Sequence, residues 1–245
     1  MSLAFITGGG AGLGAETARL ADSLGWELAI LDLSRERAAP LLETLPRARF
    51  FEGDVTREET IVAALDALGA VPDLLVNNAG IVEFRPLLET TTEDFARTIA
   101  INLTGAFTMS RLVAQRMIPR GSGSIVNITS IGGIATSPGT NAYAGAKRGL
   151  AAMTEMMAQE WGPLGLRINS VAPGMIHGGM STSIYDDPAA VDRRRMGVPS
   201  RRLGTERDVA EAVMWLASDA ADYINGHELV VDGGVTKATM SMIPR

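Results

Sequence analysis

The chain has 245 residues, of which 46% are hydrophobic and 20% are charged, a composition typical of a folded globular protein. It contains no cysteine, which excludes disulfides and cysteine-based metal sites, and its two isolated histidines, His177 and His227, form no metal-ligand cluster in the sequence. The net charge of −6 argues against a general nucleic-acid binder, because affinity for phosphate comes mostly from clustered Lys and Arg.

The first expected strand covers residues 3–6 and begins almost at the first residue. We expect no targeting segment ahead of it, because a signal sequence needs a charged region, an apolar segment and a cleavage site. No apolar run approaches the roughly 20 residues that a membrane-spanning helix needs. The sequence therefore predicts a cytoplasmic protein whose partners are small molecules, with no nucleic acid and no membrane among them.

Short apolar runs alternate with longer helical patterns along the rest of the chain. Further strands are expected at residues 28–31, 49–52, 74–76, 125–128, 168–171 and 229–231, and helices at 13–24, 57–68, 92–117, 141–161 and 206–217. Such alternation predicts a parallel sheet that is covered by helices on both faces. No repeat, low-complexity tract or linker interrupts it. The expected fold is therefore α/β, a Rossmann-like doubly wound sheet in a single domain that spans residues 1–245.

A glycine-rich loop follows the first strand and leads into the first helix. Glycine can turn the chain without Cβ clashes, and such a loop brings backbone N–H groups and a helix N-terminus against a pyrophosphate. The pattern predicts a dinucleotide site that includes Gly8, Gly10, Gly12, Leu13 and Gly14. The alternative is a tight strand-to-helix turn with no ligand, because glycine-rich turns serve many purposes.

Asp32 lies at the end of the second expected strand, about 20 residues beyond the glycine loop. A carboxylate at this place can accept hydrogen bonds from both hydroxyls of the adenosine ribose, whereas it would repel a 2′-phosphate. Arg35 and Arg37 are better explained as the start of the following helix than as a phosphate clamp. The sequence therefore predicts NAD(H) as the cofactor and not NADP(H). The alternative for Asp32 is a helix-capping carboxylate.

Further motifs follow in order along the chain. They are Thr7-Gly8 with Gly12 and Gly14, Asp54-Val55, Asn77-Asn78-Ala79-Gly80, the four residues Asn102, Ser130, Tyr143 and Lys147, the stretch from Arg167 to Gly174, and Val231-Asp232-Gly233-Gly234. Over essentially its whole length the chain resembles the short-chain dehydrogenase/reductase family. The resemblance implies that Asp54 and Val55 contact the adenine and that Asn78, Ala79 and Gly80 belong to the cofactor site. The two asparagines are also suited to stabilise backbone turns.

Tyr143 and Lys147 lie one helical turn apart. Hydride transfer at an alcohol carbon needs a group that removes or supplies the hydroxyl proton, and Tyr143 is the candidate. Its pKa, ordinarily near 10, would have to fall by about 3 units to operate near neutrality, which corresponds to roughly 4 kcal/mol. An ammonium about 4 Å away contributes roughly 4 kcal/mol at an effective dielectric constant of 20. We therefore expect Lys147 to supply most of this shift, with oxidised nicotinamide adding a second positive charge.

The family resemblance assigns further roles to the same group of residues. It implies that Lys147 also holds the nicotinamide ribose, that Ser130 hydrogen-bonds the substrate oxygen, and that Asn102 positions a water in a proton relay. Each residue also has a simpler explanation. Tyr143 would then be a half-buried helix residue, Lys147 a solvated charge, Ser130 a strand-end cap and Asn102 a helix-bending polar group. Their joint occurrence within the expected architecture favours the catalytic interpretation.

Residues 175–200 break the regular pattern just beyond a strand end, where doubly wound folds bind ligands. We expect them to form the substrate loop, with Pro173 and Gly174 as a wall beside the nicotinamide. The loop contains the run Arg193-Arg194-Arg195. Such a run could contact an acidic carrier protein, but it is more often solvated surface.

One position departs from the family pattern. Many family members have a threonine four residues after the glycine of the Pro-Gly pair, and it binds the nicotinamide carboxamide, but here that position is Gly178. Ser181 or Thr182 would replace the hydroxyl if the loop folds over the site. The other hypothesis is that the backbone at Ile176 holds the carboxamide.

The leading hypothesis is an NAD-dependent oxidoreductase that interconverts a small secondary alcohol, polyol or hydroxy acid and its carbonyl form. A 3-oxoacyl-[acyl-carrier-protein] reductase is one alternative, although the segment 162–165 lacks the basic residue that tends to mark this substrate class in the family. A non-catalytic dinucleotide-binding protein is the other, and it is disfavoured because none of the four catalytic positions is missing. The family resemblance also implies a homotetramer.

Overall fold

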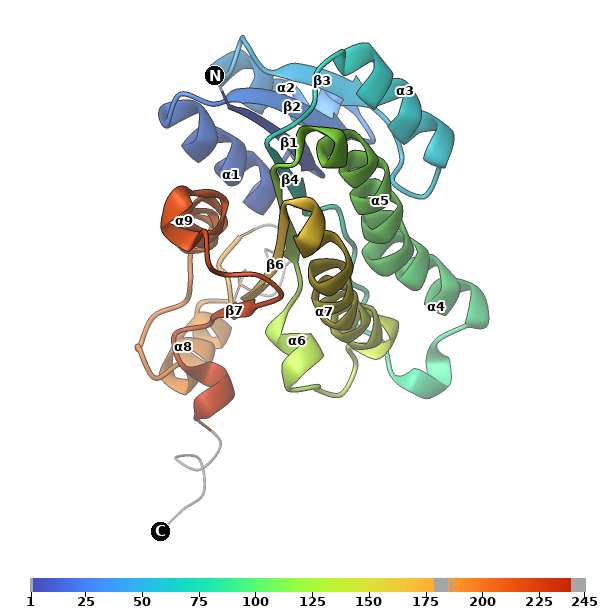
Figure 1. The fold of residues 1–245 in the computed structure, drawn as a ribbon. Helices are drawn as coiled ribbons and strands as arrows, with labels where there is room; N and C mark the ends of the chain where they lie inside the picture. Colours follow the sequence, from blue (N-terminus) through green and yellow to red (C-terminus); the bar gives the residue numbers. More distant parts are fainter. Residues whose placement is uncertain (1, 179–184, 186, 239–245) are drawn as a thin grey trace.

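The structure is a computed structural model, and it describes residues 2–178, 185 and 187–238. It contains a parallel sheet of seven strands in the order β3-β2-β1-β4-β5-β6-β7 (Figure 1). The strands are β1 (Leu3–Thr7), β2 (Glu27–Asp32), β3 (Arg49–Glu52), β4 (Leu74–Asn77), β5 (Gly123–Ile128), β6 (Leu166–Pro173) and β7 (Glu228–Val231). The predicted doubly wound α/β fold is therefore confirmed, with each expected strand in place.

Helices cover both faces of the sheet (Figure 1). On one face α1 (Gly12–Ser23), α2 (Arg35–Thr44) and α9 (Glu206–Ala217) bury their apolar residues against the strands. On the other face α3 (Glu58–Leu68), α5 (Gly105–Met117) and α7 (Asn141–Trp161) do the same. Two further helices, α6 (Ile131–Ile134) and α8 (Pro188–Gly197), follow the carboxyl ends of β5 and β6.

The central strand β1 shows why this arrangement follows from the sequence. All five of its residues are buried. Ala4 and Ile6 face the α1 and α9 side, whereas Leu3 and Phe5 face the α3 and α5 side. A strand with alternate residues in two different cores must be largely apolar, and the run from Leu3 to Ile6 is; the polar Thr7 ends the strand.

The expected single helix at 92–117 is interrupted. It consists of α4 (Thr92–Ile99), a π-helical segment (Ala100–Thr104) and α5. Within the π-helical segment, Asn102 donates its side-chain amide to the carbonyl of Thr98 at 3.0 Å and to the carbonyl of Ile81 at 2.9 Å. An amide side chain that bonds the backbone in this way competes with regular helical hydrogen bonding, and single π turns are frequent at functional sites.

The region 175–200, which was expected to be irregular, contains the helix α8. Asp187 caps this helix by accepting a hydrogen bond from the amide of Ala189 at 2.9 Å, and Pro188 occupies the first helical position. Both are standard helix-start signals. The prediction was wrong here because the Asp-Pro pair indicates a turn as readily as a helix start.

A buried polar network joins the two central strands to the helices of one face. Asn77 on β4 donates to the side-chain oxygen of Asn127 on β5 at 2.8 Å and to Ser110 on α5 at 2.7 Å. Asn127 in turn donates to Thr154 on α7 at 2.9 Å. The side chain of Asn77 therefore has a structural role, which agrees with the sequence-based interpretation.

We predict that Asn127→Ala lowers the free energy of unfolding by about 2 kcal/mol, because it removes two buried hydrogen bonds and leaves a cavity. Ser124→Ala is the matched control on the same strand. The Ser124 hydroxyl is buried and has no hydrogen-bond partner among the described residues, so its loss should change stability by less than about 0.5 kcal/mol. Urea unfolding followed by circular dichroism measures both, and equal effects of the two substitutions would contradict the network's role.

Candidate active site

The polar residues singled out by the sequence gather at the carboxyl edge of the sheet, where the loops after β1 and β4 turn in opposite directions. Thr7 and Asn78 tie these two loops together. The side-chain amide of Asn78 donates to the carbonyls of Thr7 at 3.0 Å and Gly8 at 2.9 Å, and the Thr7 hydroxyl accepts from the amides of Asn78 and Ala79 at 3.1 Å. In doubly wound sheets this change of direction creates the ligand-binding crevice.

The glycine loop at this crevice requires glycine for steric reasons. A Cβ at Gly8, whose φ is +61°, would lie 2.8 Å from the Cα of Ala79. One at Gly14 would lie 2.4 Å from the carbonyl oxygen of Gly8. Gly12 begins α1, and the preceding Ala11 provides no side-chain cap for the first amides of this helix. Uncapped amides at a helix start beside a closely packed glycine loop fit a dinucleotide pyrophosphate, and Leu13 lies in the same first turn.

Asp32 ends β2, as predicted, and it also holds the glycine loop. Its carboxylate accepts hydrogen bonds from the amide of Gly10 at 2.9 Å and from the amide of Leu33 at 2.7 Å. It does not cap the following helix, because Ser34 does so by accepting from the amide of Arg37 at 3.3 Å. The alternative interpretation of Asp32 as a helix cap is therefore wrong, and sequence reasoning missed its contact with Gly10.

The other cofactor residues predicted from the family resemblance lie in the two neighbouring loops. Asp54 follows β3, and its carboxylate accepts from both the amide and the hydroxyl of Thr56 at 2.8 Å. Val55 is buried so closely against Gly105 that a Cβ on that glycine would come within 2.9 Å of it. A Cβ at Gly80 would lie 2.6 Å from the side-chain oxygen of Asn102. These contacts fix the loops that line the crevice.

Ser130, Tyr143 and Lys147 are brought together by the packing of α6 on α7. Ser130 caps α6 by accepting from the amide of Gly132 at 3.0 Å, and its hydroxyl also hydrogen-bonds Tyr143. Gly133 permits the close contact between the helices, since a Cβ there would lie 2.9 Å from the amide nitrogen of Arg148. Lys147 donates to the carbonyl of Ile128 at 2.8 Å, and its nitrogen lies 5.6 Å from the centre of the Tyr143 ring.

Asn102 is completely buried and, like Lys147, lies beside Gly80, since a Cβ on Gly80 would come within 2.6 Å of the Asn102 oxygen and 3.5 Å of the Lys147 nitrogen. Besides its two donor contacts, its side-chain oxygen accepts from the amide of Ile81 at 3.3 Å. The side chain thus connects the π-helical segment to the loop after β4. The water-positioning role that the resemblance implies stays a prediction, and the side-chain amide is already committed to the backbone.

The pKa values of this group differ from the sequence-based expectation. Burial raises the pKa of Tyr143, and the hydrogen bond from Ser130 opposes this only in part. Burial also lowers the pKa of Lys147 to about 8, so Lys147 remains mostly protonated at neutral pH. The expected depression of the Tyr143 pKa is therefore absent in the protein alone, because desolvation of the phenolate dominates. Lys147 is 3% exposed, so its interpretation as a solvated charge is wrong.

On the substrate side, β6 ends at Pro173, and Gly174 approaches the neighbouring strand closely. The amide of Gly174 donates to the carbonyl of Val231 at 2.9 Å, and a Cβ at Gly174 would lie 2.6 Å from the Cα of Asp232. Ile176 then forms a parallel bridge with Gly204. The bridge uses the Met175 carbonyl and the His177 amide, and the amide of Ile176 itself takes no part in it.

Gly178, the position of the missing threonine, has a geometric reason to be glycine. Its φ of +137° disfavours any residue with a side chain. A Cβ there would also lie 2.7 Å from a carboxylate oxygen of Glu206, the first residue of α9. The two candidate replacements, Ser181 and Thr182, lie outside the described residues.

Within residues 2–178, 185 and 187–238, no three or more His, Asp or Glu side chains form a group that could hold a metal ion. None of the helices in the same ranges is both long enough and apolar enough to cross a membrane.

Comparison with known proteins places this architecture among characterised enzymes. A family model described as Enoyl-(Acyl carrier protein) reductase matches residues 8–236. D-threitol dehydrogenase of Mycolicibacterium smegmatis is 35% identical over 241 residues, which cover 96% of this chain and 92% of that protein. 2-(S)-hydroxypropyl-CoM dehydrogenase 3 of Xanthobacter autotrophicus is 37% identical over 243 residues, which cover 94% and 95% of the respective chains.

A solved structure extends the similarity to three dimensions. The crystal structure of a gluconate 5-dehydrogenase from Burkholderia cenocepacia, in complex with NADP and tartrate, matches with a TM-score of 0.92 at 33% identity. The match covers 97% of this chain and 96% of that chain. The similarity therefore extends over the whole fold and is not confined to the glycine loop.

We predict that Lys147→Met abolishes the part of the pH dependence of the unfolding free energy that comes from protonation of Lys147. The unfolded chain takes up the lysine proton below pH 10.5, but the native state does so only below about pH 8. Between these values the native state loses stability as the pH falls, by about 3 kcal/mol in total at 1.36 kcal/mol per pKa unit. As the pH rises from 8 to 10.5, the unfolding free energy of wild type should therefore increase by about 3 kcal/mol more than that of Lys147→Met.

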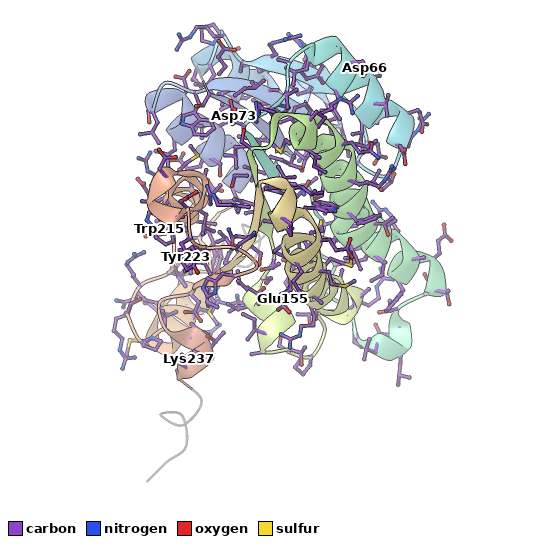
Figure 2. The ribbon with its side chains drawn as sticks, viewed as in Figure 1. Asp66, Asp73, Glu155, Trp215, Tyr223 and Lys237 are labelled. Carbon is purple, nitrogen blue, oxygen red and sulfur yellow. The ribbon has the colours of Figure 1, made fainter. Side chains whose placement is uncertain are left out.

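The only other lysine in the sequence, Lys237, provides the control, because it lies on the surface (Figure 2). Lys237→Met should show the same pH dependence as wild type in urea unfolding. If Lys147→Met and wild type changed in parallel over this range, the strongly lowered pKa of Lys147 would be disproved.

Proposed function

Because this chain belongs to the short-chain dehydrogenase/reductase family, we propose that it transfers a hydride between NAD(H) and a small secondary alcohol, polyol or hydroxy acid and its carbonyl form. The observation that carries the proposal is the group of Ser130, Tyr143 and Lys147 at the carboxyl edge, next to the glycine loop. The three similar proteins named above are dehydrogenases, and this supports an oxidoreductase that uses a nicotinamide dinucleotide.

When bound, the nicotinamide supplies or accepts the hydride. The protein's part is to position the substrate oxygen and to move its proton. The Ser130 hydroxyl would hydrogen-bond that oxygen, and the Tyr143 phenol would donate a proton to it in carbonyl reduction or remove one in alcohol oxidation. The raised pKa of Tyr143 keeps the phenol protonated in the protein alone, which suits the acid role.

The base role needs added positive charge beside the phenol. The Lys147 ammonium lies 5.6 Å from the centre of the Tyr143 ring and is mostly protonated at neutral pH. A positive charge on this side of the ring attracts a phenolate and so favours loss of the phenol proton. Lys147 thus opposes the effect of burial, and the oxidised nicotinamide would supply further positive charge.

The cofactor would lie across the crevice, with its pyrophosphate at the glycine loop and the start of α1. Asp32 would accept hydrogen bonds from the adenosine ribose, and Asp54 and Val55 would contact the adenine. Pro173 and Gly174 would wall the nicotinamide. For the carboxamide we propose the backbone amide of Ile176, because the bridge with Gly204 does not use it.

A second candidate is a 3-oxoacyl-[acyl-carrier-protein] reductase. The matching family model is described as Enoyl-(Acyl carrier protein) reductase, which shares the carrier-bound acyl substrate with this candidate but reduces a carbon–carbon double bond and not a carbonyl group. The segment 162–165 is Gly-Pro-Leu-Gly and lacks a basic side chain for an acidic carrier protein. The homotetramer that the family resemblance implies stays a prediction, which light scattering would decide, and so does the cytoplasmic location.

The test of function is a substrate panel. We expect reduction of NAD with at least one of a set of secondary alcohols, polyols and hydroxy acids, and Tyr143→Phe should lower kcat by about 10²- to 10⁴-fold through loss of the acid/base group. The panel includes a 3-oxoacyl substrate on its carrier protein with reduced cofactor. Turnover of this substrate alone would favour the reductase. Cofactor binding without turnover of any substrate would contradict both enzymatic proposals.

Cofactor choice is tested separately with Asp32→Asn, which keeps the acceptor for the Gly10 amide but removes the charge. We predict that wild type prefers NAD over NADP, and that the substitution raises kcat/KM for NADP by about 10-fold through loss of repulsion, equivalent to about 1.4 kcal/mol. The substitution should lower kcat/KM for NAD by much less than 10-fold. A wild-type enzyme that prefers NADP would refute the assignment of Asp32.

A further inference from the structure

The three consecutive arginines of α8 lie in different environments. Arg193 pairs with Asp187 at 3.4 Å and Arg195 pairs with Asp192 at 3.2 Å, and both arginines are exposed. Arg194 is half-buried, and no carboxylate of the described residues lies within ion-pair distance of it. The expectation that the whole run is solvated surface therefore fits two of the three residues.

Arg194 instead lies over an aromatic ring. Its guanidinium carbon lies 5.5 Å from the centre of the Tyr185 ring, and Tyr185 is only 7% exposed. A contact of this kind holds the cation over the ring, and its N–H groups can still donate hydrogen bonds. A half-buried guanidinium held in this way can bind a carboxylate through two parallel hydrogen bonds.

Tyr185 also links Arg194 to the substrate side of the active site, at the end of β6. The other contact of the Tyr185 ring is His177, at 5.2 Å between ring centres. His177 follows the Pro173-Gly174 wall by three residues, and its amide donates to the carbonyl of Gly204 at 2.8 Å. A continuous series of contacts thus runs from the strand end beside the proposed nicotinamide site, through His177 and Tyr185, to Arg194.

We propose that Arg194 binds the carboxylate of the substrate, and that the enzyme acts on hydroxy acids and their keto acids in preference to neutral alcohols. This rests on the proposed function and narrows its substrate class. A half-buried cation with no counter-ion among the described residues is costly unless a ligand supplies one, and a substrate carboxylate does so. The neighbouring Arg193 and Arg195 already have their carboxylates on the surface and take no part.

The experiment compares substrates that differ in the carboxylate, namely 3-hydroxybutyrate with 3-hydroxybutyramide, threonate with threitol, and gluconate with sorbitol. Wild type should show the higher kcat/KM for the acid in each pair that it turns over. Arg194→Gln should lower kcat/KM for the acid by about 10- to 100-fold, mainly through KM, which is the range for loss of a charge-assisted hydrogen-bonded contact. The value for the neutral partner should change by less than about 2-fold. Arg194→Lys should restore part of the loss, because it keeps the charge but not the planar donor pair.

Arg193→Gln and Arg195→Gln are the matched controls on the same helix, and both should leave the acid and neutral substrates unaffected. Equal losses for acid and neutral substrates with Arg194→Gln would show that the arginine only supports the helix, and would overturn the proposal. A wild-type preference for the neutral partners would overturn it as well.

A binding measurement separates this inference from the proposed function, because it needs no turnover. In the presence of NAD, isothermal titration with malate as the probe should show binding to wild type and at least 10-fold weaker binding to Arg194→Gln. Equal malate affinity, or no malate binding to wild type, would refute the carboxylate site even if the enzyme oxidises alcohols. Malate binding that depends on Arg194, together with no turnover on the panel, would uphold the site and refute the proposed reaction.

Discussion

The structure depends on one constraint, that a parallel sheet with helices on both faces buries its strands, so that the polar side chains inside it, such as Asn77 and Asn127, are tied into hydrogen bonds and reactive groups collect at the strand ends. All five residues of β1 and all four of β4 are buried, so the loops at the carboxyl ends are where functional groups can meet. The hydrogen bonds from Asn78 to Thr7 and Gly8 hold the two central loops at a fixed separation. The glycine loop, Asp32 and the Tyr143 group are all positioned relative to this pair.

The chemistry of the site conflicts with the burial that the fold imposes. Burial raises the pKa of Tyr143 and lowers that of Lys147, and both shifts oppose the charged forms that alcohol oxidation would use. The hydrogen bond from Lys147 to the carbonyl of Ile128 keeps the ammonium in place beside the phenol. A buried cation that lowers stability is consistent with a group retained for function, because perturbed pKa values gather at reactive sites.

Differences from the family pattern lie where the substrate would bind. Gly178 has a φ of +137°, and a Cβ there would meet the Glu206 carboxylate, so a threonine at this position would strain the backbone and displace the Glu206 side chain. The contacts of Tyr185 with His177 and Arg194 join α8 to the same strand end. The core and the cofactor loops follow the family pattern, whereas the region after β6 is where this chain would acquire its own specificity.

The sequence by itself determined the doubly wound fold, the seven strands and the position of Asp32 at the end of β2. Apolar runs and helical periodicity are local properties, and each can be read without knowing what the segment contacts. Only the tertiary structure decided that Asp32 bonds Gly10, that Asn102 lies in a π-helical segment bonded to Ile81, and that Lys147 is buried. It also decided which of three adjacent arginines is half-buried. These properties depend on contacts between residues far apart in the chain and on the desolvation that packing produces, and neither leaves a periodic signal in the sequence.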